Sequence, residues 1–330
     1  MQSAGSSSLT VRAAAKINLH LGVGAPREDG FHPLDTVYQA VSLYDDLTVT
    51  EAEEWSLTTV VDPSLGEVEL PGPGQNIVDR VAELLCAERR AGVRPAGHVE
   101  VLKAIPVAGG MAGGSADAAA ALVALDRLWE LETPDQVLLD LAARLGSDVP
   151  FSLVGGTARG LGRGEVVTPL VDNGTWSWVV VPDAGGLSTP AVFRHWDALH
   201  RDALHRDALH SDALHSDALH RDALGGDVPP PTPADAVLKA LASGDPHALA
   251  AAMHNDLQSA ALDLRPDLGD LIALGESEGA LRGLVSGSGP TCVFLCESPQ
   301  AAREGAAGLR STRETVLLAH GPVAGAHVLG

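Results

Sequence analysis

The chain has 330 residues, of which 45% are hydrophobic and only 3% aromatic, and its formal net charge is −21. This length predicts two domains or one large one, with a core packed mainly by Val, Leu and Ala. Nucleic-acid binding requires a basic surface that neutralises phosphates, so the strong negative charge argues against a nucleic-acid partner. An acidic protein can bind an anionic ligand only locally, and the chain has just three lysines, Lys16, Lys103 and Lys239.

The cysteines and the N-terminal segment indicate the cellular compartment of the protein. An odd set, Cys86, Cys292 and Cys296, has no pairing pattern and fits a reducing compartment. Cys292 and Cys296 lie in an apolar run, so we interpret them as core residues rather than metal ligands. Residues 1–10 lack the basic and apolar regions of a signal peptide, and no apolar run approaches the ~20 residues of a membrane span. We expect a cytoplasmic protein without a membrane partner.

Hydrophobic periodicity predicts elements of both kinds along the chain. The first strand is expected over residues 10–23, with Lys16, Asn18 and His20 on its polar face. Further strands are expected over residues 38–50, 55–61, 98–105, 151–154, 176–181 and 291–296. Helices are expected over residues 77–91, 115–131, 134–145, 234–242, 248–262 and 268–278. This mixture predicts an α+β protein with two domains, residues 1–170 and 171–330.

A pentad repeat interrupts the second half. From Asp197 to Leu224 the sequence Asp-Ala-Leu recurs six times at a spacing of five, mostly followed by histidine. Five residues turn a helix by about 500°, so the leucines spiral around it and form no apolar stripe. We interpret residues 197–224 as a low-complexity insert tolerated as a surface loop. The alternative, a histidine metal site, is disfavoured because imidazoles at this spacing do not converge.

The strongest chemical signal is a glycine-rich run between a predicted strand and a predicted helix. Glycines let backbone N–H groups approach an anion, and a helix N-terminus adds free N–H groups and partial positive charge. The spacing matches neither a Walker A loop nor the dinucleotide fingerprint. We predict a phosphate-binding loop; the alternative is a glycine-rich turn capped by Ser115. The loop consists of Pro106, Val107, Ala108, Gly109, Gly110, Met111, Ala112, Gly113, Gly114 and Ser115.

Three further motifs carry polar groups in defined places. The first strand contains Lys-Ile-Asn-Leu at residues 16–19, Gly-Ser-Asp-Val-Pro occupies residues 146–150, and Ser-Gly-Ser-Gly-Pro occupies residues 286–290. Taken singly, they could be a solvent-facing strand edge, a capping aspartate at Asp148 and an ordinary tight turn.

Together and in this order, the four motifs resemble those of the GHMP kinase superfamily. Residues 27–39, Arg-Glu-Asp-Gly-Phe-His-Pro-Leu-Asp-Thr-Val-Tyr-Gln, and the run Leu-Tyr-Asp-Asp at 43–46 are similar to one branch of it. That branch phosphorylates the 2-hydroxyl of a diphosphocytidyl-linked methylerythritol in the non-mevalonate route to isoprenoids. The resemblance covers the chain apart from the pentad insert. Ala112 and Ala116 depart from the Gly and Ser often found there, which argues against a metal-binding hydroxyl at position 116.

The resemblance implies a two-domain fold, with an N-terminal domain like the second domain of ribosomal protein S5 and a ferredoxin-like C-terminal domain. It also implies ATP with Mg²⁺, and a small-molecule acceptor bound in the cleft between the domains. The implied roles are catalysis by Lys16 and Asp148, adenine proximity for Asn76, and acceptor binding by Asn18, Phe31, His32 and Phe193.

Phosphoryl transfer needs positioning and charge stabilisation more than covalent chemistry. The pair implied by the resemblance suits it, because a carboxylate can accept the hydroxyl proton and a lysine can hold that carboxylate ionised. Two alternatives remain: a non-catalytic nucleotide sensor on the same scaffold, and another GHMP kinase with a small alcohol acceptor.

Overall fold

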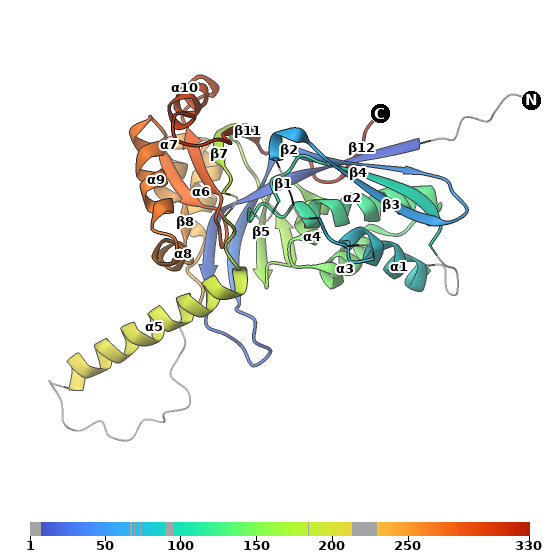
Figure 1. Ribbon diagram of the computed structural model, residues 1–330. Helices are drawn as coiled ribbons and strands as arrows, with labels where there is room; N and C mark the ends of the chain where they lie inside the picture. Colours follow the sequence, from blue (N-terminus) through green and yellow to red (C-terminus); the bar gives the residue numbers. More distant parts are fainter. Residues whose placement is uncertain are drawn as a thin grey trace, which may run out of the picture.

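The computed structural model describes residues 8–66, 68, 70–72, 74–89, 95–107, 109–183, 185–212 and 230–330, with side chains for all of these except 201–212. Ala108 of the predicted phosphate loop lies outside this set, as do residues 213–224 of the pentad segment. Two sheets, each covered by helices, stand next to each other (Figure 1).

The larger sheet is built on two long neighbouring strands. Its main path runs β12-β1-β2-β4-β3, and β5 and β6 extend it from β2, while β8 pairs with β1. The strands are β1 (Ser8–Val23), β2 (Leu34–Thr50), β3 (Trp55–Val61), β4 (Gly97–Lys103), β5 (Thr157–Gly162), β6 (Val166–Pro169), β8 (His254–Asn255) and β12 (His327–Val328). A short 3₁₀ helix, η1 (Pro63–Leu65), follows β3.

Helices α1 (Ile77–Arg89), α2 (Gly113–Leu128), α3 (Asp135–Leu145) and α4 (Val149–Val154) lie together on one side of this sheet (Figure 1). Helix α2 is the central one, and most of its residues from Ala116 to Asp126 are buried. Its small alanine side chains let the helix approach β1 and β2 closely. The start of α2 is thereby held directly beside the Lys16 strand.

The smaller sheet is antiparallel, in the order β11-β7-β10-β9. Its strands are β7 (Trp176–Val181), β9 (Arg282–Val285), β10 (Cys292–Cys296) and β11 (Leu317–Gly321). Cys292 and Cys296 are buried in its core, as predicted. The helices of this half are α5 (Thr189–Asp212), α6 (Asp235–Ser243), α7 (Pro246–Ala252), α8 (Gln258–Leu264), α9 (Asp267–Ser277) and α10 (Pro299–Leu309).

Two predicted elements were wrong. Residues 151–154, expected as a strand, belong to helix α4, because a proline in the first turn is preorganised for a helix and Gly155 ends it. The single helix expected over 248–262 is divided into α7 and α8 by β8. There Asn255 leaves the helical conformation and its amide donates to the carbonyls of Val285 and Gly287.

The pentad segment begins as a helix rather than a loop. Helix α5 runs without a break from Thr189 into the repeats as far as Asp212 and projects from the body of the molecule (Figure 1). The repeat lacks an apolar stripe, but its Ala and Leu residues have high helix propensity. Strand β12 returns to pair with β1, so the larger sheet includes residues from both ends of the chain. The predicted boundary near residue 170 stays a prediction.

Candidate active site

A cleft of about 1000 Å³ lies between the two sheets. It is lined by every predicted site residue that the structure describes, with the exception of Ser115. Ser115 lies in the first turn of α2 and does not cap it, since the N-cap residue is Ala112. The four motifs, far apart in sequence, therefore meet at one place.

The glycine loop connects β4 to α2 and is fixed from two sides. The backbone N–H of Lys16 donates to the carbonyl of Met111 at 3.1 Å, which ties the loop to β1. Gly110 has φ of +77°, and a Cβ there would lie 3.0 Å from the carbonyl oxygens of Ser286 and Gly289. Glycine is needed at 110 because the two glycine-rich turns pack directly against each other.

The last two glycines of the loop face different surroundings. A Cβ at Gly113 would point inward, 3.1 Å from Nζ of Lys103 and 3.3 Å from Ile105. A Cβ at Gly114 would meet nothing within 4 Å, and this residue lines the cleft. The backbone at 114 is therefore open to a ligand, at the end of a helix where free N–H groups favour an anion.

Lys16 is buried, with 6% of its surface exposed, and its surroundings fix the ammonium group. Nζ donates to Oδ1 of Asn18 at 2.8 Å, and the amide of Asn18 donates in turn to the Thr36 hydroxyl at 2.8 Å. A Cβ at Gly287 would lie 3.5 Å from Nζ, so the turn 286–290 closes over the pair. The β1 motif is thus an enclosed site and not a solvent-facing strand edge.

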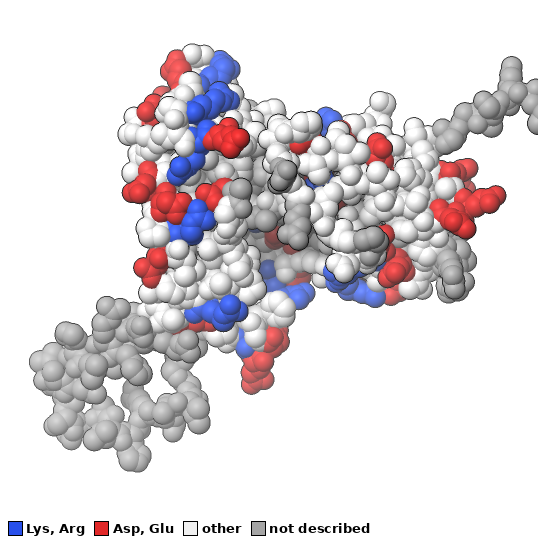
Figure 2. All heavy atoms as spheres, viewed as in Figure 1, with Lys and Arg blue, Asp and Glu red and all other residues white. Residues whose placement is uncertain are grey.

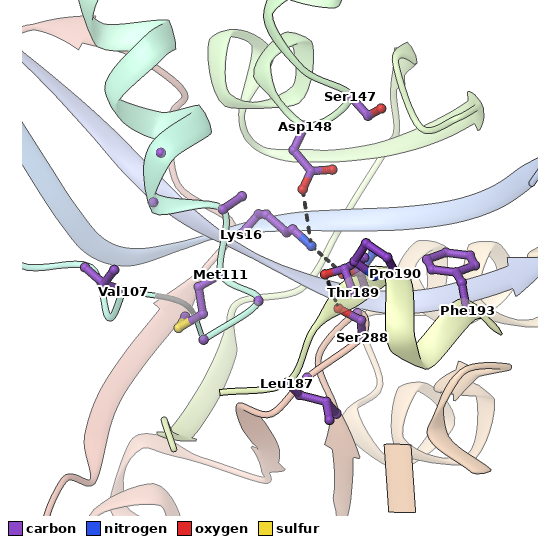
Figure 3. Close-up of a pocket in the computed structure, with 18 of the residues that line it drawn as sticks. Lys16, Val107, Met111, Ser147, Asp148, Leu187, Thr189, Pro190, Phe193 and Ser288 are labelled. Carbon is purple, nitrogen blue, oxygen red and sulfur yellow. Dashed lines mark hydrogen bonds and ion pairs between the residues drawn. The ribbon is translucent and has the colours of Figure 1, made fainter. Parts of the chain in front are cut away.

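Asp148 precedes helix α4 but does not cap it with its side chain. One carboxylate oxygen accepts a hydrogen bond from the Tyr38 hydroxyl at 3.1 Å, and the other lies 3.6 Å from Nζ of Lys16. Figure 3 shows the carboxylate pointing toward the lysine across the cleft. Burial and the nearby Asp148 raise the pKa of Tyr38 well above its usual value, so the phenol stays protonated and donates.

A buried charge cluster lies beneath the glycine loop. Lys103 donates to the carboxylates of Asp45 and Asp117. Burial lowers the pKa of Lys103, but the two carboxylates outweigh it and the pKa is raised. Burial raises the pKa of Asp117 to about 8. Asp45 also accepts from the backbone N–H groups of Ala104 and Ile105, so the cluster fixes the chain where it enters the loop.

Aromatic residues gather at the other end of the cleft. Phe193 on α5 lies against the ring of His32, with 4.8 Å between ring centroids. Phe31 is 48% exposed, and the guanidinium of Arg163 lies 4.9 Å from its ring centroid. Asn76 lines the cleft near the loop, while its Oδ1 accepts from the N–H of Val78 at the start of α1.

The cleft differs in charge from the rest of the chain. Its charged lining residues are Lys16, Lys103, Arg163, Arg194, Asp117, Asp148 and Asp197. Four are basic and three are acidic, in a chain whose net charge is −21. Basic side chains group around the hollow between the two halves (Figure 2). This near balance of charge makes the cleft more favourable to anionic ligands than the acidic surface elsewhere.

Several cleft residues were not predicted. Tyr38, Lys103, Arg163 and Asp197 come from different elements. Tyr38 stands within the stretch 27–39, but nothing in that stretch marked it as a cleft residue. Thr189 and Ser288 also line the cleft, where their hydroxyls are 2.8 Å apart and link α5 to the turn 286–290 (Figure 3). The scarcity of lysine could have drawn attention to Lys103.

Comparison with known families agrees with this geometry. The profile described as "GHMP kinases N terminal domain" matches residues 76–156, and the one described as "GHMP kinases C terminal" matches residues 237–314. The crystal structure of L. major mevalonate kinase has the same fold, with a TM-score of 0.68 over 95% of this chain and 96% of its own at 16% identity. The chain is a GHMP kinase, an ATP-dependent transferase.

More similar relatives indicate which branch of the GHMP kinases the chain belongs to. A 4-diphosphocytidyl-2-C-methyl-D-erythritol kinase of Nocardioides sp. is 59% identical over 97% of this chain and 99% of its own length. The one from Streptomyces coelicolor is 48% identical over 98% and 99%. A crystal structure titled 4-(cytidine 5'-diphospho)-2C-methyl-D-erythritol kinase has a TM-score of 0.69 at 31% identity, over 94% of this chain and 98% of its own. The chain belongs to the 4-diphosphocytidyl-2-C-methyl-D-erythritol kinase family, which confirms the resemblance of residues 27–46.

Proposed function

We propose that the chain transfers the γ-phosphoryl group of ATP to the 2-hydroxyl of 4-diphosphocytidyl-2-C-methyl-D-erythritol, with Asp148 as general base and Lys16 as its partner. The observation that carries this proposal is the direction of the Asp148 side chain. It does not cap its helix but reaches Lys16 and Tyr38, between the glycine loop and the aromatic end of the cleft.

The acceptor hydroxyl would meet Asp148 on the oxygen that faces Lys16. A carboxylate there can accept the hydroxyl proton as the oxygen–phosphorus bond forms. The Tyr38 hydrogen bond holds the other oxygen, so the carboxylate keeps one orientation. The fixed ammonium group of Lys16 offsets negative charge on the transferring phosphoryl group. Asn18, which holds Lys16, would also hydrogen-bond the erythritol.

The triphosphate would lie along residues 106–115, with its oxygens toward the open backbone at Gly114 and the start of α2. Asn76 would lie near the adenine. Phe31 and Phe193 would stack on the two faces of the cytosine ring, and His32 would contact its edge. We locate the reaction in the cytoplasm, because an odd number of cysteines without a pairing pattern fits a reducing compartment.

Mg²⁺ is expected to enter with ATP and would neutralise charge on the phosphates. Phosphate oxygens and water supply most of its ligands in such sites, with one or two carboxylates from the protein. The cleft offers Asp148 and Asp117, whose Oδ1 is buried and makes no hydrogen bond with any described residue. Ala116 has no hydroxyl, so it supplies no side-chain ligand.

A coupled ADP-release assay over a panel of acceptors tests the proposal. We expect turnover with the diphosphocytidyl acceptor and not with homoserine or mevalonate. Turnover with either of these instead would favour another GHMP kinase activity. ATP binding without turnover on any acceptor would favour a nucleotide sensor, in which the placement of Lys16 and Asp148 would have no function.

A further inference from the structure

His32 and Asp197 form a close pair at the acceptor end of the cleft. His32 lies in the connection between β1 and β2, and Asp197 lies one turn beyond Phe193 on α5. Nε2 of His32 is 3.6 Å from Oδ2 of Asp197, with 8% of the histidine side chain and 23% of the aspartate side chain exposed. Both residues line the cleft, so the pair faces a ligand.

The other nitrogen of His32 defines the ring orientation. Nδ1 lies 2.8 Å from the carbonyl oxygen of Gly24, and a carbonyl can only accept, so Nδ1 carries a hydrogen. Phe193 packs against the face of the ring, and Trp196 meets it edge-on at 5.7 Å between centroids. Nε2 is therefore the ring atom directed at Asp197.

Asp197 is also the first residue of the pentad repeat, and this first copy is built into the fold. Trp196, just before it, is 4% exposed, and Leu199 packs against the core of the smaller sheet. The His200 ring stacks on Trp196 with 3.9 Å between centroids, and its Nδ1 lies 3.0 Å from the Trp196 carbonyl oxygen. These contacts fix the turn of α5 that presents Asp197.

We propose that Asp197 is a positioning residue for the acceptor site: it orients the His32 ring so that Phe193 and His32 form a fixed wall for the nucleobase. The first copy of the repeat is thereby part of the site. This inference rests on the proposed function, because it concerns binding of a diphosphocytidyl acceptor and not the chemical step.

Steady-state kinetics of Asp197→Asn test the inference. Losing the carboxylate oxygen that faces Nε2 predicts a rise of about fivefold or more in acceptor KM, while kcat and the KM for ATP stay within about twofold. In a His32→Gln background, Asp197→Asn should have no further effect, because Asp197 acts through His32. Asp197→Glu keeps a carboxylate and should therefore have a lower acceptor KM than Asp197→Asn.

The chain supplies a matched control, because a second histidine on α5 pairs with an aspartate on α8. His195 and Asp263 form a second pair, at 2.6 Å, that is more exposed and outside the cleft. Asp263→Asn should leave the KM values of both substrates unchanged.

An unchanged acceptor KM in Asp197→Asn would overturn the inference. An equal effect of Asp197→Asn on acceptor KM in the wild-type and His32→Gln backgrounds would also overturn it. A parallel rise in the KM values of both substrates, together with a lower melting temperature, would do the same. If wild type did not phosphorylate this acceptor, the proposed function would fail separately. Calorimetric affinity for cytidine diphosphate would still compare Asp197→Asn with wild type, and equal affinities would then overturn the inference.

Discussion

The contacts of the Asp148 side chain favour a chemical role over a helix-capping role. A capping carboxylate would accept from the backbone of α4, whereas this one is 3.6 Å from Lys16 and accepts from Tyr38. Asp148→Asn keeps the shape but removes the base, so we expect kcat to fall by about 10²–10⁴ while ATP still binds. Asp140→Asn, on the exposed side of α3, is the control. A kcat for Asp148→Asn within threefold of wild type would exclude the base role.

Gly114 offers a direct test of the phosphate loop. Because a side chain there would enter open space in the cleft, Gly114→Val should raise the Kd for ATP at least about tenfold, with little change in melting temperature. Gly113 is the contrasting position, since a side chain there would press on Lys103 and Ile105 and should lower stability. Calorimetry showing unchanged ATP affinity for Gly114→Val would refute this placement of the phosphates.

Phe193 packs against the face of the His32 ring in the cleft. Base–aromatic stacking contributes about 1–3 kcal/mol, so Phe193→Ala should raise the acceptor KM by about tenfold and leave the KM for ATP unchanged. Phe193→Tyr keeps an aromatic face and should behave like wild type. Equal increases in both KM values would indicate a folding defect in place of lost stacking.

At the residue scale, much of the cleft could be predicted because its residues stand in contiguous motifs. Lys16, Asp148 and the glycine loop were found in this way, and the structure brings them together. Tyr38 and Arg163 were not found, because Tyr38 reaches the site by pairing opposite Asn18 in the sheet and Arg163 lies in the connection after β5. Ser115 was included by its place in the motif, although its side chain is outside the cleft.

At the element scale, Asp35 joins three parts of the fold. It accepts two hydrogen bonds from Arg159 on β5 and one from the backbone N–H of Ala234 before α6. Burial acts to raise the pKa of Asp35, but these hydrogen bonds outweigh it and the pKa is lowered. Such a carboxylate stabilises the fold above its unfolded pKa, and that stability is lost as pH falls through the folded pKa.

Asp35→Asn should therefore lower the free energy of unfolding by about 1–3 kcal/mol at pH 7. The difference from wild type should shrink as pH falls below about 4, where the wild-type carboxyl also becomes neutral. Urea unfolding at several pH values measures it. Asp29→Asn removes an exposed arginine pair and should change little. A difference for Asp35→Asn that did not vary with pH would contradict the ionic role.

Strands and helices with clear periodicity were predicted well, and β3 and β7 have the predicted bounds. The errors occur where tertiary contacts override a local pattern. Residues 248–262 are periodic enough for one helix, but Asn255 interrupts it and donates to the carbonyls of Val285 and Gly287. Residues 151–154 are apolar enough for a buried strand, but Pro150 and Gly155 delimit a short helix there, which packs against α2 and α3.

At the scale of the whole molecule, the site exists only where the two sheets meet. The glycine loop and Lys16 come from the larger sheet, while Phe193 and the turn 286–290 come from the other half. Sequence periodicity cannot predict this docking, because it depends on side chains that meet across long separations. The order of the four motifs indicated that the two halves form one site only through the resemblance to a known family.

The pentad segment beyond the first copy should be dispensable. Its copies are nearly identical, whereas repeats whose residues pack in a core usually differ from copy to copy. A long insertion also costs little loop-closure entropy. We expect excision of residues 201–224 to leave kcat and acceptor KM within about twofold of wild type. A severalfold rise in acceptor KM alone would show that the later copies also act at the acceptor site.

The proposed activity is the phosphorylation of one hydroxyl of one acceptor in this cleft. Its most direct test is ³¹P NMR of purified protein incubated with ATP, Mg²⁺ and 4-diphosphocytidyl-2-C-methyl-D-erythritol. We expect one new phosphomonoester signal without three-bond proton coupling, because C2 of the methylerythritol carries no hydrogen, and an equal amount of ADP. ADP without the new phosphomonoester, or a phosphate on another hydroxyl, would contradict it.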